Sequence, residues 1–186
     1  IDEAGNTYDE WTVYSVGGGA LAEEGHSSIQ TPDVYELNHL NDIIKWCDER
    51  GYSYWQFVEQ FEESDIWDYL EEVWKVMCQA VERGLETEGV LPGGLNLRRK
   101  APHYYIKAQG YSANLQTRGL VFAYALAVTE ENASGGRIVT APTCGSCGVL
   151  PAVLYHTWRS RDFSETRILH ALATAGLIGN VVKENA

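Results

Sequence analysis

The feature that most constrains the fold of this chain is a long helical pattern between residues 65 and 88. Gly89 follows the pattern, and glycine is a common residue just beyond the end of a helix. A helix of this length with one apolar face needs other elements to cover that face, so the pattern predicts a helical core. The apolar side chains recur every three or four positions: Ile66, Leu70, Val73, Met77, Val81 and Leu85.

Comparable patterns predict helices on both sides of this one. Thr31 and Pro32 suit the start of a helix whose apolar stripe runs to Cys47, and Ser53 with Gln56 forms a capping box for a short helix. Further helices are predicted at residues 112–131, from near residue 148, and after residue 164, which makes roughly six in all. The fold class is therefore mainly α.

Two segments of this helical region have special composition. The last helix is rich in alanine and glycine, which allows another backbone to approach closely, so we expect it to be central. Residues 89–102 form a loop with the basic run Arg98, Arg99 and Lys100. That run could clamp an anion or be a solvated surface.

The first residues have a different character. Residues 7–16 alternate in the manner of a β-strand, and Gly17 to Gly19 permit a tight turn. One or two strands do not form an independent sheet, so we expect residues 1–30 to be the end of an upstream β domain and residues 31–186 to be a helical domain. The chain begins with Ile1 and ends in VVKENA without a helix stop signal, as expected for a piece of a longer protein.

Composition and charge exclude some classes of function. No run of 18 or more apolar residues occurs and no signal peptide precedes the first helix, which predicts a cytoplasmic protein without a membrane partner. Residues 1–90 hold 4 Lys and Arg against 21 Asp and Glu, whereas residues 91–186 hold 10 against 5. The acidic half would repel phosphates, so nucleic acid is not an expected partner.

The stretch TAPTCGSCGVLPAVL carries the pattern with the clearest chemistry. Cys47 and Cys78 lie in helical patterns and are expected to be buried, but Cys144 and Cys147 stand three apart in a turn. A structural zinc site would need a second such pair, and a thioredoxin-like pair would need a βαβ context. An iron–sulfur ligand and an inert loop remain open from spacing alone.

The position of Cys147 favours a ligand. It precedes a predicted helix, where free backbone N–H groups and the helix dipole favour a thiolate. Gly145 and Gly148 leave room for a bulky group near the backbone. Thr140, Thr143 and Ser146 supply hydroxyl groups around the turn, although turn hydrogen bonds would also explain them.

Four stretches of the chain resemble the iron–sulfur-dependent L-serine dehydratases, also called L-serine ammonia-lyases. They are YSVGGG near the start, GLETEGVLPGGLNLRRKAP in the middle, TAPTCGSCGVLPAVLY, and ALATAGLIGNVVKENA at the end. The resemblance covers nearly the whole chain and implies the end of that family's β domain followed by the first part of its helical catalytic α domain.

The resemblance also implies a cofactor and a reaction. The family holds a [4Fe-4S] cluster through cysteines, and one open iron acts as a Lewis acid for departure of the hydroxyl when L-serine becomes pyruvate and ammonia. Cys147 matches a cluster cysteine, whereas Cys144 falls where many members have asparagine. The remaining ligands would lie beyond Ala186, so the isolated chain is expected to be inactive.

The resemblance suggests further site residues. Lys183 opens a family motif that leads to the cluster ligands, so it is a candidate for general base or carboxylate anchor. Thr140, Thr143 and Ser146 are candidates for orienting the substrate. A homodimer is a candidate assembly. The alternative reading of the whole chain is a helical interaction module with a redox-active or incidental Cys-x-x-Cys.

Overall fold

The computed structural model describes residues 12–17, 20–23, 34–140 and 144–185. Within them the chain is mainly α, as the sequence predicts. In these described residues, two short strands, β1 (Val13–Gly17) and β2 (Ala20–Glu23), precede seven helices and one 3-10 turn, η1 (Cys144–Ser146). The helices are α1 (Leu40–Arg50), α2 (Tyr54–Phe61), α3 (Ile66–Glu86), α4 (Ala101–Gln109), α5 (Ala113–Ala133), α6 (Val149–Arg161) and α7 (Glu165–Glu184).

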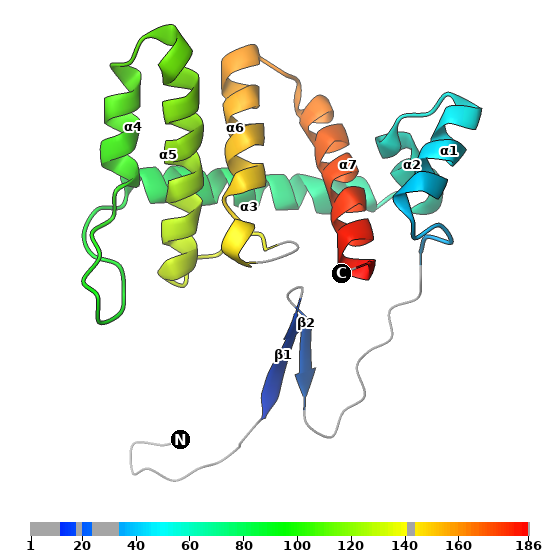
Figure 1. Ribbon diagram of the computed structural model, residues 1–186, viewed down its shortest axis with the longest axis horizontal. Helices are drawn as coiled ribbons and strands as arrows, with labels where there is room; N and C mark the ends of the chain where they lie inside the picture. The colour runs from blue at the N-terminus through cyan, green and yellow to red at the C-terminus, as the bar shows by residue number, and fades with distance from the viewer. Residues whose placement is uncertain (1–11, 18–19, 24–33, 141–143, 186) are drawn as a thin grey trace.

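The long helix predicted from the apolar stripe is the element on which the others assemble. Helices α4, α5, α6 and α7 stand side by side, and α3 runs across them (Figure 1). At the crossing with α5, a Cβ on Gly84 would lie 2.4 Å from the carbonyl oxygen of Ala127, so only glycine permits this approach. The core residues of α3 are Leu70, Trp74, Met77, Ala80 and Val81.

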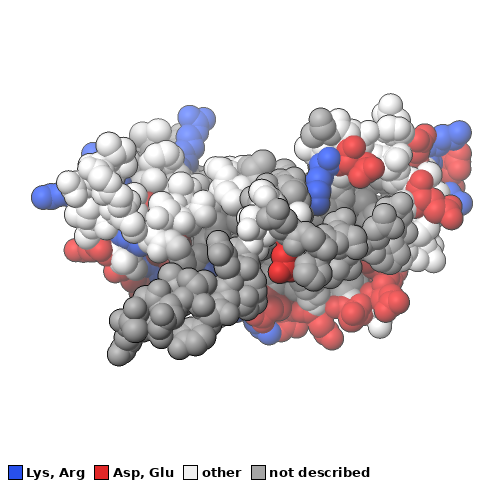
Figure 2. Space-filling model, turned by 90° about the horizontal axis from the view of Figure 1, so that it is seen from below, with Lys and Arg blue, Asp and Glu red and all other residues white. Residues whose placement is uncertain are grey.

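The two strands form an antiparallel hairpin in which Val13 pairs with Glu23, with an irregularity between Ser15 and Gly17. This agrees with the predicted strand, although residues 7–11 of that strand and residues 18–19 of the predicted glycine turn lie outside the described part of the chain. The predicted domain boundary near residue 30 also lies outside it. The acidic side chains gather mostly toward the end of the molecule that carries α1 and α2 (Figure 2).

The start of the first helix differs from the prediction. Thr31 and Pro32 lie outside the described residues, but residues 34–38 are not helical and α1 begins only at Leu40. The reason is tertiary, because Tyr35 stacks on Phe57 with ring centroids 5.6 Å apart. By contrast, the capping box of α2 is confirmed, and the Ser53 N–H donates to Gln56 Oε1 at 2.8 Å.

Helix α4 is absent from the prediction, which assigns residues 89–102 to a loop and begins the next helix at residue 112. Pro102 lies in the first turn of α4, where its missing N–H is not needed. The helix start is capped from a distance, because the Glu130 carboxylate accepts hydrogen bonds from the N–H groups of Lys100 at 2.7 Å and Ala101 at 3.3 Å. A cap 30 positions away leaves no local sequence signal.

The basic run before α4 contains a buried ion pair. The Arg99 side chain is 7% exposed and bonds to Glu131 at 3.0 Å, and Arg83 reaches the other carboxylate oxygen at 3.0 Å. Both predicted alternatives, an anion clamp and a solvated surface, are therefore wrong for Arg99. Arg98 and Lys100 are exposed.

Helix α7 is less enclosed than its composition predicts. Ile168, Leu172 and Leu177 are buried against the core, but Gly176 is exposed. A Cβ at Gly176 or Gly179 would meet nothing within 4 Å among the described residues. Within the described residues, the predicted close approach of another backbone does not occur at these two glycines, which border an open groove.

Candidate functional site

The described part of the cysteine turn leads directly into α6. Cys144 begins η1 and is exposed, and Cys147 follows it immediately before Gly148, the N-cap of α6. The side-chain amide of Asn132 donates to the Cys144 carbonyl at 3.2 Å, which ties the turn to the end of α5. The prediction of a turn running into a helix near residue 148 is confirmed.

Cys147 is buried, with 3% of its surface exposed, and belongs to the hydrophobic core. Burial raises the pKa of its thiol and the neighbouring Cys144 adds to the rise, while the backbone N–H groups of Cys147 and Gly148 act in the opposite direction. The helix start thus acts in the predicted direction, but loss of hydration outweighs it and the net shift favours the thiol.

Gly148 has a packing role that the sequence did not indicate. A Cβ at this position would lie 2.4 Å from the carbonyl oxygen of Ala125 and 3.0 Å from Thr129 Oγ1. The room expected beside Gly148 is therefore filled by α5 of the same chain. This contact holds the start of α6, and with it Cys147, against α5.

The cysteines of this chain do not fit a complete four-iron cluster. Such a cluster is held by several cysteine thiolates. Cys47 is buried in α1 and Cys78 lies in α3, and all four cysteines are free. In residues 12–17, 20–23, 34–140 and 144–185, no three His, Cys, Asp or Glu residues are grouped as metal ligands.

Two of the predicted site residues line one groove. Thr140 and Lys183 both border a cavity of about 430 Å³ that lies between α3, α7 and the segment leading to the cysteine turn. Its walls are mainly apolar and include Ile66, Leu70 and Leu150. Ser146 lies in the exposed cysteine turn, and Thr143 is outside the described residues.

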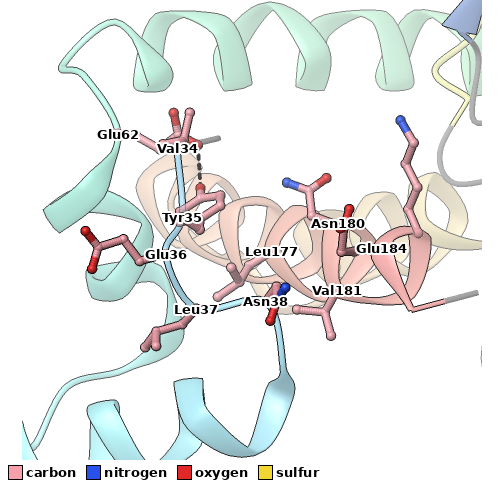
Figure 3. A pocket seen from close by; sticks show the side chains of 11 residues that line it. Val34, Tyr35, Glu36, Leu37, Asn38, Glu62, Leu177, Asn180, Val181 and Glu184 are labelled. Carbon is pink, nitrogen blue, oxygen red and sulfur yellow. Dashed lines mark hydrogen bonds between the residues drawn. The ribbon is translucent and has the colours of Figure 1, made fainter. Parts of the chain in front are cut away.

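An adjoining cavity of about 670 Å³ shares several polar residues with this groove, while Glu36, Asn38 and Glu184 border the adjoining cavity alone. Tyr35, Glu62, Asn180 and Lys183 border both cavities. The Tyr35 hydroxyl donates a hydrogen bond to Glu62 Oε1, and the labelled side chains of Glu62, Tyr35 and Asn180 lie around the same opening (Figure 3). We call the two cavities together the α3–α7 groove.

Sequence reasoning missed Tyr35, Glu62 and Asn180. Tyr35 and Glu62 are 27 positions apart, and each is an ordinary residue in its own segment. Asn180 is part of the motif that ends in KENA, and its spacing of three from Lys183 places both on one face of α7. This spacing from Lys183 was the sequence signal that could have indicated Asn180.

The fold and the groove define a helical domain with an apolar cleft that carries a few convergent polar groups, which is the usual form of a small-molecule site.

None of the helices in the described part of the chain is long and apolar enough to cross a membrane. A family model described as serine dehydratase alpha chain matches residues 13–186. The chain belongs to this family.

Curated relatives agree with the family model. The chain is 38% identical to L-serine dehydratase TdcG of Escherichia coli (strain K12) over 94% of its own length and 42% of the relative. It is 36% identical to the L-serine dehydratase of Haemophilus influenzae over 100% of its length and 44% of the relative. It is 37% identical to the L-serine dehydratase of Streptomyces coelicolor over 94% of its own length and 41% of the relative. The chain thus spans about two fifths of these relatives.

Proposed function

We propose that this chain is part of an L-serine dehydratase that converts L-serine into pyruvate and ammonia. The observation that carries the proposal is the identity of 36–38% to proteins named L-serine dehydratase over at least 94% of the chain. The α3–α7 groove supports it, because it offers a site of suitable chemistry for a small polar substrate.

The reaction has two demanding parts. Loss of the α-proton and the β-hydroxyl from L-serine gives water and 2-aminoacrylate. The imine tautomer of this product then takes up water to give pyruvate and ammonia. The α-proton is weakly acidic and hydroxide is a poor leaving group, so the enzyme needs a base and a group that assists hydroxide.

We assign Lys183 as the carboxylate anchor in this reaction. Its exposed side chain borders the α3–α7 groove from the last turn of α7, where an ammonium group can hold an anionic ligand. Thr140 borders the same groove and is suited to orient the substrate by hydrogen bonding. Thr143 and Ser146, on the segment that follows, are proposed to orient the substrate from the cysteine turn.

We further propose that Cys147 is one ligand of a [4Fe-4S] cluster whose other ligands lie outside this chain. Its match to the family motif supports this assignment. Because the four cysteines of this chain do not form that set, we expect the isolated chain to be inactive.

The remaining predictions concern the setting of the enzyme. We propose that residues 1–30 are the end of a β domain and that residues 31–186 are the first part of the catalytic α domain. We also propose that the enzyme acts on L-serine in the cytoplasm. A homodimer is the candidate assembly. The rival hypothesis, a helical interaction module with an incidental Cys-x-x-Cys, has no observation in its favour beyond the cysteine spacing.

A chimeric enzyme tests the proposed function. This chain would replace the matched residues of the Escherichia coli relative, and the product would be reconstituted anaerobically with iron and sulfide. We expect pyruvate formation from L-serine. Cys147→Ser should abolish the activity, whereas Cys144→Ser, in the same turn, should retain it. A folded chimera that needs pyridoxal phosphate, or a fully active Cys147→Ser variant, would contradict the proposal.

A further inference from the structure

Glu62 is a half-buried carboxylate at the end of α2 on the wall of the α3–α7 groove. Its hydrogen-bond partner is the Tyr35 hydroxyl, and in the described part of the chain no Lys, Arg or His pairs with it. A carboxylate that is partly removed from water and lacks a counter-ion favours the binding of a cation. Glu62 therefore gives one side of the groove a negative charge without a protein partner.

The surrounding residues hold Glu62 in place. The Tyr35 ring stacks on Phe57 with centroids 5.6 Å apart and meets Phe61 edge-on at 6.4 Å. Burial raises the pKa of the Tyr35 hydroxyl, and the Glu62 carboxylate raises it further, so the hydroxyl stays protonated and donates to Glu62. One oxygen of the carboxylate thus accepts this hydrogen bond, and among the described residues the other oxygen accepts none.

The opposite charge comes from α7. Lys183 borders both cavities of the groove and forms no ion pair in the part of the chain that the structure describes. Asn180, one turn earlier, adds an amide, and Figure 3 shows its side chain at the opening that Tyr35 and Glu62 also border. The groove therefore presents the half-buried Glu62 and, from another element, Lys183, both without an ion-pair partner in the described residues. The exposed carboxylates Glu36 and Glu184 border the larger cavity as well.

We propose that Glu62, positioned by Tyr35, binds the α-ammonium group of the substrate amino acid, while Lys183 and Asn180 hold its carboxylate. The inference rests on the proposed function, because it places the L-serine zwitterion in the groove. An ammonium group supplies the missing counter-ion and donates to the free carboxylate oxygen. Glu62 is thereby a specificity residue, since it excludes hydroxy acids that lack the ammonium group.

Binding to the purified 186-residue protein can test this assignment without catalysis. Two ligands would be titrated by NMR: L-serine, and 3-hydroxypropanoate, which lacks the ammonium group. Glu62→Gln keeps a carbonyl that accepts the Tyr35 hydrogen bond, so the fold should persist. We expect this variant to bind L-serine at least about tenfold more weakly. It should bind 3-hydroxypropanoate as well as the wild type does or better, because the negative charge that disfavours this anion is gone. Glu63→Gln, which changes the adjacent exposed carboxylate, should match the wild type for both ligands.

Several results would overturn the inference. These are unchanged L-serine binding in Glu62→Gln, an equal loss for both ligands, an equal effect of Glu63→Gln, or no L-serine-dependent shifts at Glu62 and Asn180 in the wild type. Failure of the proposed function is distinguishable, because it would be absence of pyruvate formation by the chimera. Glu62-dependent binding of L-serine would stand in that case.

Discussion

At the residue scale, Cys147 and Gly148 show how neighbours alter what a motif predicts. The sequence correctly places both at the start of a helix. It does not predict that α5 packs against Gly148 and bonds to the turn at Cys144, because Ala125 and Asn132 belong to another segment of the chain. Burial then changes the chemistry expected from the motif, since the thiol pKa rises where the helix N-terminus alone would lower it.

The contact at Gly148 predicts a large effect of a small substitution. Gly148→Ala would place a methyl group 2.4 Å from the Ala125 carbonyl oxygen, so α5 and α6 must move apart. We expect a loss of about 1–3 kcal/mol in the free energy of unfolding, measured by urea denaturation.

Gly176→Ala is the matched control for this prediction. Gly176 lies inside α7 and has open space around it, so alanine should stabilise the protein by about 0.5–1 kcal/mol through helix propensity. Equal effects of the two substitutions would show that the α5–α6 contact does not constrain position 148.

At the scale of helices and strands, the sequence predicted a helix correctly where nearby residues supply its cap or its apolar stripe. The capping box at Ser53 and the long stripe of α3 are confirmed. The start of α1 and the whole of α4 were missed, because distant groups decide them. Tyr35 is held by the aromatic residues of α2, and Glu130 of α5 caps α4.

The buried pair between Arg99 and Glu131 should matter more to stability than its sequence setting suggests. Arg99→Met removes one partner and leaves the Glu131 carboxylate, with 8% of its side chain exposed, paired only to Arg83. We expect a loss of about 3 kcal/mol in the free energy of unfolding, measured by urea denaturation.

An exposed ion pair provides the comparison. Glu72 contacts Arg137 at 3.3 Å, and both side chains are mostly in solvent. Glu72→Gln should therefore cost less than about 1 kcal/mol. A smaller loss for Arg99→Met than for Glu72→Gln would show that the Arg99 pair does not anchor the loop before α4.

At the scale of the whole molecule, the α3–α7 groove could not be predicted from local patterns. It is formed by residues 34–38, α2, α3, α7 and the segment before the cysteine turn. The sequence motifs identified Thr140 and Lys183, which the fold brings to one cavity. The contribution of Tyr35 and Glu62 depends on how α2 packs, and no motif of the sequence marks them. The mainly α class, in contrast, followed directly from the apolar periodicity.

The central claim is that this groove is the substrate site of an L-serine dehydratase, and the Michaelis constant of the chimera for L-serine tests it most directly. Lys183→Met removes the proposed carboxylate anchor, so we predict that KM for L-serine rises about tenfold or more. Lys107→Met changes an exposed lysine at the end of α4, away from the groove, and should leave KM unchanged. An unchanged KM in Lys183→Met, or the same rise in Lys107→Met, would contradict the account.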